Sequence, residues 1–75
     1  MEFKIKLSDS NDVRNFVHIC EKHIGAVTVN SEKYIVDGKS IMGVFSLDLT
    51  NPIMVKFEYE VSKNIIDELN NYCIE

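Results

Sequence analysis

Residues 53–60 read Ile53-Met54-Val55-Lys56-Phe57-Glu58-Tyr59-Glu60. Large apolar side chains occupy every second position, beginning at Ile53 and ending at Tyr59. This period of two is typical of a β-strand that buries one face and exposes the other. Residues 3–7, Phe3-Lys4-Ile5-Lys6-Leu7, repeat the alternation between apolar and charged side chains. The sequence therefore predicts two half-buried strands, and alternation of this kind is most common in antiparallel sheets.

The stretch between residues 11 and 24 has helical rather than strand periodicity. Its apolar positions recur at steps of three and four residues: Val13, Phe16, Val17, Cys20 and Ile24. The polar cluster of residues 8–12 supplies capping side chains. We expect the helix to begin near residue 11 and to stop at Gly25, which suits the left-handed conformation just past a helix end.

Four further elements complete the order. Residues 26–29 and 33–36 are β-branched and aromatic, which predicts a hairpin with a three-residue connection. Ser40 can cap a short helix over residues 40–47, although Gly43 weakens its helical pattern, and Ser62 can cap a last helix. The stripe of that last helix is Ile65, Ile66, Leu69, Tyr72 and Cys73.

The resulting order is βαββαβα, which defines the fold class as α+β. We expect one domain over residues 1–75, an open-faced β-sandwich with a four-stranded antiparallel sheet and three helices on one face. The opposite face should remain wet, and its charged side chains are Lys4, Lys6, Lys56, Glu58 and Glu60. A chain of 75 residues has room for a thin core only, so any site should lie on the surface.

Composition excludes several function classes. The net charge is −4 and Arg14 is the only arginine, which disfavours nucleic acid as a partner. No signal-peptide pattern and no apolar run of membrane-spanning length occurs, so we expect a cytoplasmic protein without a membrane partner. Cys20 and Cys73 lack metal-ligand spacing, and we expect reduced thiols in the core. The sequence indicates no metal site and no cofactor.

The titratable side chains do not form a catalytic arrangement. Helical geometry places His18 on the solvated side of its helix and His23 at the border of the apolar stripe, so the two imidazoles do not converge. The acidic pairs Asp67–Glu68 and Glu58–Glu60 should lie on polar faces, whereas a general acid needs a buried carboxyl group. The glycines are too dispersed for a phosphate-binding loop. We therefore expect no catalytic residues and no enzyme.

One stretch, residues 36–47, exceeds this background. It reads Val36-Asp37-Gly38-Lys39-Ser40-Ile41-Met42-Gly43-Val44-Phe45-Ser46-Leu47. Two interpretations of its apolar side chains fit the pattern equally well. Ile41, Met42 and Phe45 are either core residues behind a simple N-cap, or an adaptable contact surface displayed beside Ser40.

Residues 39–47 resemble the regulatory-serine signature of HPr, the small phosphocarrier protein of the bacterial sugar phosphotransferase system. The resemblance extends without a gap from about Val13 to Tyr72, and the βαββαβα order is also that of the HPr fold. It implies a protein that exchanges phosphate with protein partners.

The phosphoacceptor motif of the family is absent. HPr carries phosphate on a histidine in a Gly-x-His-Ala-Arg-Pro motif at the start of its first helix, whereas residues 8–15 of this chain contain no histidine. Two alignments are open. Either Arg14 matches the family arginine and Asp12 replaces the histidine, or the loop has lost about three residues. Asp9, Asp12 and Arg14 therefore form a degenerate active-site loop, in which Asp12 could mimic the phosphorylated state.

The serine region is intact. In HPr of Gram-positive bacteria, and in the histidine-lacking relative Crh, this serine is phosphorylated by an HPr kinase, and the product binds a regulator of catabolite repression. Ser40 matches that serine, and the resemblance implies that Ile41, Met42 and Phe45 bind the partner. We expect Lys39 to help neutralise the phosphate, and Asp37 and Asp48 to repel it if they lie close.

The preferred interpretation is a non-catalytic regulatory or adaptor protein. Two alternatives stay open: a phosphocarrier with a non-standard site, and a diverged interaction module unrelated to sugar regulation.

Overall fold

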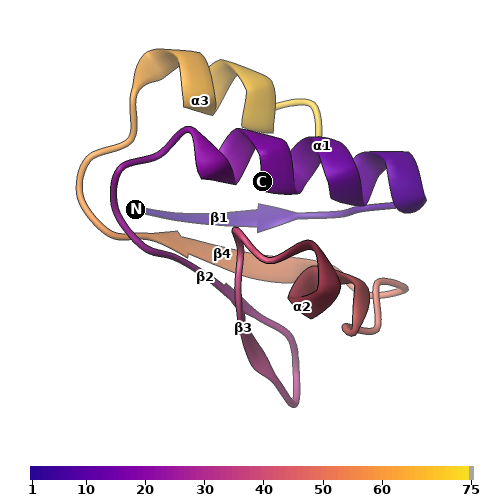
Figure 1. The fold of residues 1–75 in the computed structure, drawn as a ribbon. Coiled ribbons are helices and arrows are strands. Elements are labelled where there is room, and N and C mark those ends of the chain that lie inside the picture. Colours follow the sequence, from indigo (N-terminus) through magenta and orange to yellow (C-terminus); the bar gives the residue numbers. More distant parts are fainter. Residues whose placement is uncertain (75) are drawn as a thin grey trace.

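The computed structural model describes residues 1–74. Four strands and three helices follow one another in the predicted order βαββαβα (Figure 1). The strands are β1 (Glu2–Ile5), β2 (Val27–Asn30), β3 (Ile35–Asp37) and β4 (Ile53–Phe57). The helices are α1 (Ser10–Glu21), α2 (Ile41–Phe45) and α3 (Lys63–Leu69).

The strands form one sheet in the order β1-β4-β2-β3, with every neighbouring pair antiparallel. Central strand β4 pairs Ile53 with Ile5 on one side and Val55 with Val29 on the other. These partners are buried, because the odd-numbered residues of β4 face the helices. Figure 1 shows α1 and α3 lying side by side across this face, with α2 below α1 and close to β3. The predicted fold class is confirmed.

The core lies between the sheet and the helices. Fully buried side chains come from β1, β2, β4 and all three helices. The largest are Phe16, Ile5, Leu7, Ile53 and Leu69. Burial of apolar side chains of this size contributes about 1.5–3 kcal/mol each. Most of the buried core residues belong to the apolar stripes that the sequence predicts. No helix among residues 1–74 is long and apolar enough to cross a bilayer.

The predicted end of the first helix is wrong. Helix α1 ends at Glu21, and the amides of Lys22 and His23 turn back to the carbonyls of Ile19 and Cys20 in three-residue steps. The chain therefore leaves the helical path before Ile24, whose side chain is 91% exposed.

Gly25 is not in the left-handed conformation either, because no glycine among residues 1–74 has a positive φ. Its requirement is spatial. A Cβ at this position would lie 2.4 Å from the backbone oxygen of Glu58 and 2.7 Å from the ring of Tyr59. A side chain here would force the α1–β2 loop away from the end of β4.

The predicted strand over residues 53–60 is shorter than expected, because β4 ends at Phe57. Tyr59 adopts a φ of 68°, which breaks the alternation, and its side chain is 66% exposed. The assignment of Tyr59 to the buried face is therefore wrong. The hairpin also differs, since Asn30 belongs to β2 and residues 31–34 form the connection.

Tyr72 and Cys73 lie outside α3, which ends at Leu69. The chain instead returns to the sheet, where Cys73 bridges Ile5 of β1. On the opposite face of the sheet, Lys56 is exposed as expected. Lys4 and Lys6 are half-buried instead, and the Lys6 ammonium donates to the carbonyl oxygen of Leu49 at 2.6 Å.

Candidate docking site around Ser40

Ser40 is the N-cap residue of α2. Its backbone is extended, with φ −102° and ψ 112°, and its Oγ accepts a hydrogen bond from the Gly43 N–H at 3.1 Å. Its own N–H donates to the carbonyl of Asp37 at 3.0 Å. These bonds hold the half-buried hydroxyl at the first turn of α2, where unpaired amides gather.

Gly43 allows α2 to lie close to its neighbours. A Cβ there would lie 3.3 Å from Ser40 Oγ and 3.4 Å from the Cβ of Val36 in β3. The glycine that weakens the helical pattern in the sequence therefore lets this short helix pack on the hairpin. Val44 on the inner side of α2 is fully buried.

The other apolar side chains of α2 are exposed. Met42 is 76% exposed, Phe45 41% and Ile41 38%. Of the two interpretations of this stretch, the structure excludes the one in which all three are core residues. We call Ile41, Met42 and Phe45 the α2 patch. Adaptable methionine and aromatic side chains at a surface are typical of contacts between proteins.

Lys39 is directed toward the end of α1. Its ammonium donates to the carbonyl oxygen of His23 at 2.6 Å, and its backbone N–H donates to Asp37 Oδ1 at 2.8 Å. The Asp37 carboxylate thus belongs to the turn before Ser40. The Lys39 charge is also felt at Cys20, although burial dominates there and raises the pKa of that thiol to about 12.

Asp48 follows the other end of α2. Thr50 donates to Asp48 Oδ1 through its hydroxyl at 2.6 Å and through its N–H at 3.0 Å. These bonds hold the pKa of the exposed Asp48 carboxyl below its ordinary value. Both ends of α2 are therefore flanked by ordered acidic side chains.

The start of α1 is capped by the chain's own carboxylates. Asp9 is the N-cap, and its Oδ1 accepts from the Asp12 N–H at 2.9 Å. Asp12 Oδ2 in turn accepts from the Ser8 N–H at 2.9 Å. Arg14, two residues after Asp12, is exposed. A carboxylate already fills the position at which a helix start would hold an anion.

The two histidines lie apart, as predicted. The His18 side chain is 77% exposed and lies 3.9 Å from Glu21 on the outer side of α1. His23 is 4% exposed; its ring packs edge-on against Phe57, and Nε2 contacts the carbonyl oxygen of Glu58. Neither imidazole lies in a helix start that could hold a phosphoryl group.

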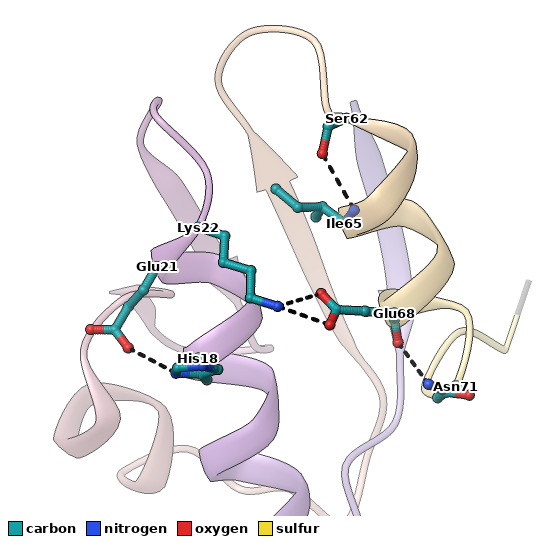
Figure 2. A network of polar contacts seen from close by, with 7 residues as sticks. All are labelled: His18, Glu21, Lys22, Ser62, Ile65, Glu68 and Asn71. Carbon is teal, nitrogen blue, oxygen red and sulfur yellow. Dashed lines mark hydrogen bonds and ion pairs between the residues drawn. The ribbon is translucent and has the colours of Figure 1, made fainter.

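Glu68, an acidic residue of α3, forms an ion pair with the end of α1. Figure 2 shows Lys22, just past α1, reaching across to Glu68 of α3, with N–O distances of 2.9 and 3.0 Å. Ser62 caps α3 by accepting from the Ile65 N–H at 3.4 Å (Figure 2). Within residues 1–74, no three His, Cys, Asp or Glu side chains are placed to bind a metal ion.

The element order and the sheet topology define a small α+β protein with the HPr-like fold. A search of solved structures matches the HPr-C-His protein of Thermoanaerobacter tengcongensis at 24% identity and a TM-score of 0.73, covering 95% of this chain and 85% of that one. It also matches the phosphocarrier protein HPr of Bacillus anthracis at 18% identity and a TM-score of 0.70, covering 97% and 95%. No protein-family model and no curated protein sequence matches the chain.

Sequence reasoning missed the contacts that assemble the site. Nothing in the local pattern links Lys39 to the carbonyl of His23, because a backbone acceptor has no sequence signature. The close approach of Glu58 to Gly25 is also non-local. Gly25 is the only local signal of this approach, and a glycine there fits a helix stop equally well.

Proposed function

We propose that this chain is an HPr-like regulatory or adaptor protein of the sugar phosphotransferase system, acting in the cytoplasm. In this proposal the α2 patch binds a protein partner, and phosphorylation of Ser40 controls that binding. The observation that carries the proposal is the exposure of Ile41, Met42 and Phe45 directly after a serine that caps their helix. An apolar surface adjoining a modifiable hydroxyl lets charge control a contact whose affinity comes from burial.

The start of α2 can tolerate a phosphate. A phosphoserine carries about −1.5 to −2 charge, which is favourable beside the unpaired amides of a helix start. The Gly43 N–H already points at Ser40 Oγ, so a phosphate there keeps a donor within reach. Lys39 is held at His23, and Asp37 and Asp48 flank the helix. The proposed partner therefore supplies arginine or lysine opposite Ser40 and a pocket for the α2 patch.

The start of α1 argues against histidine phosphotransfer. The Asp12 N–H already donates a hydrogen bond to the Asp9 carboxylate, and residues 8–15 include no histidine. His18 and His23 lack the free helix-start amides that would hold a phosphoryl group.

Treatment with an HPr kinase and ATP tests the proposal, with intact-mass detection of the product. We expect wild type to gain one phosphoryl group and Ser40→Ala to gain none. Ser62→Ala is the matched control, because Ser62 is also a helix N-cap. It should be modified like wild type. If wild type and Ser40→Ala both remain unmodified while authentic HPr is modified, the switch is absent and Ser40 is an N-cap only.

A further inference from the structure

Over the described residues, the chain covers one edge of the sheet with its own backbone and leaves the other edge open. The C-terminal segment runs beside β1, where the Lys6 N–H donates to the carbonyl of Tyr72 at 2.9 Å and the Ile74 N–H donates to the carbonyl of Lys4 at 3.0 Å. Cys73 bridges Ile5 between these bonds. The chain thus covers the β1 edge with its own backbone. Strand β3 forms the other edge, and it has no such cover among residues 1–74.

The hydrogen-bond pattern shows which backbone groups of β3 face outward. Antiparallel strands exchange hydrogen bonds at alternate residue pairs. Between β2 and β3, the Ser31 N–H donates to the carbonyl of Tyr34, and the Gly38 N–H donates to that of Val27. The pair Val29–Val36 lies two residues from each of these hydrogen-bonded pairs. Val36 therefore directs its N–H and C=O toward β2.

Ile35 and Asp37 belong to the alternate pairs that exchange no hydrogen bonds with β2. Their backbone N–H and C=O groups therefore point away from the sheet. The carbonyl of Asp37 accepts from the Ser40 N–H, which accounts for one outward group. The N–H and C=O of Ile35 and the N–H of Asp37 have no hydrogen-bond partner in the described chain. These three groups form a row that an extended backbone can satisfy.

The side chains at this edge are also uncovered. Ile35 is 74% exposed and Tyr34 is 62% exposed. Ile35 and the exposed Ile24 line a shallow hollow of about 510 Å³ beside the start of β2. A residue paired directly with Ile35 would place its side chain on the same face of the sheet, against Ile35.

We propose that the β3 edge binds an extended peptide segment of a protein partner, which adds to the sheet as a fifth strand. The unpaired groups of Ile35 and Asp37 supply the backbone bonds, and an apolar residue opposite Ile35 covers its side chain. A second copy of the chain is a poorer occupant. A three-residue edge buries far less than the roughly 1,200–2,000 Å² of a stable interface, and both copies carry a charge of −4. That charge favours a peptide with basic residues.

Peptide selection tests this proposal without any dependence on Ser40. A phage-displayed random-peptide library is selected against the full chain, and the recovered peptides are synthesised. Amide hydrogen exchange of the isotope-labelled protein is then measured with each peptide. We expect recovered peptides to slow exchange at Ile35 and Asp37 and to leave the α2 amides unchanged.

Two variants and one control isolate the edge. Ile35→Pro removes an outward N–H without breaking the bonds between β2 and β3, and it should weaken peptide binding about tenfold or more. Ile35→Lys, at a side chain already exposed, should fold and also weaken binding. Ile35→Thr keeps the N–H and should bind.

Three results would overturn the proposal. The first is recovery of no peptide, and the second is protection confined to α2. The third is self-association in sedimentation analysis that Ile35→Pro abolishes, which would assign the edge to a second copy.

Discussion

The ammonium of Lys39 donates to the carbonyl oxygen of His23 across 2.6 Å. The acceptor lies two residues past the end of α1, where carbonyls lack helical partners and a cation is favourable. The donor immediately precedes Ser40. This one bond therefore joins the end of α1 to the start of α2. His23 is itself anchored through its ring to the end of β4.

Replacing Lys39 with methionine should lower the free energy of unfolding by about 1 kcal/mol, because it removes a charged donor from a part-buried carbonyl. Methionine keeps most of the apolar stem. Urea unfolding of Lys39→Met beside Lys33→Met measures the effect, since Lys33 is exposed in the β2–β3 connection. Equal stabilities of the two variants would show that the bond contributes nothing.

Cys20 should make the fold sensitive to alkali. Burial raises the pKa of its thiol from 9.0 to about 12 in the folded state. Below pH 9 the thiol is protonated in both states, and its contribution to stability is fully present. As the pH rises from 9 toward 12, the unfolded chain releases the proton first, so stability falls.

Urea unfolding at about pH 8 and about pH 10 tests this, with Cys20→Ala as the comparison. The variant should be less stable at the lower pH, because it leaves a small cavity, yet should lose less stability between the two values. A loss identical to that of wild type would exclude Cys20 as a source of the alkaline sensitivity.

The elements with strong periodicity could be predicted from the sequence. Alternation in residues 3–7 and 53–60 identified β1 and β4, although both strands end earlier than predicted. The three- and four-residue steps from Val13 to Ile24 identified the buried side of α1, although Ile24 lies beyond its end. Each pattern reports a single buried face, which local sequence determines. Together with the hairpin and the two capped helices, these elements give the order βαββαβα, which is sufficient for the fold class.

Element ends could not be predicted, because they depend on partners distant in sequence. Ile24 fits the helical stripe, but His23 takes the buried place beside Phe57 and the chain turns away. Tyr59 fits the strand alternation, but its positive φ ends the pairing at Phe57. The exposure of the α2 patch was likewise open, since a short helix can bury or display the same residues.

Enzyme I and phosphoenolpyruvate should not phosphorylate this chain. The start of α1 contains no histidine, and its Asp12 N–H already donates a hydrogen bond to the Asp9 carboxylate. Intact-mass measurement under alkaline conditions, which preserve phosphohistidine, gives the result. A stable gain of one phosphoryl group on His18 or His23 would contradict the prediction and restore the phosphocarrier alternative.

In the proposed function, phosphate on Ser40 controls docking on the α2 patch. Calorimetric titration of a purified catabolite-repression regulator with the Ser40-phosphorylated and unmodified chains measures this control. Phosphorylation should tighten binding about tenfold or more. Met42→Ala in the phosphorylated chain should cost about 1–2 kcal/mol of binding free energy, whereas Met54→Ala on the open sheet face should cost nothing measurable. Equal affinity of the phosphorylated and unmodified chains would contradict the claim.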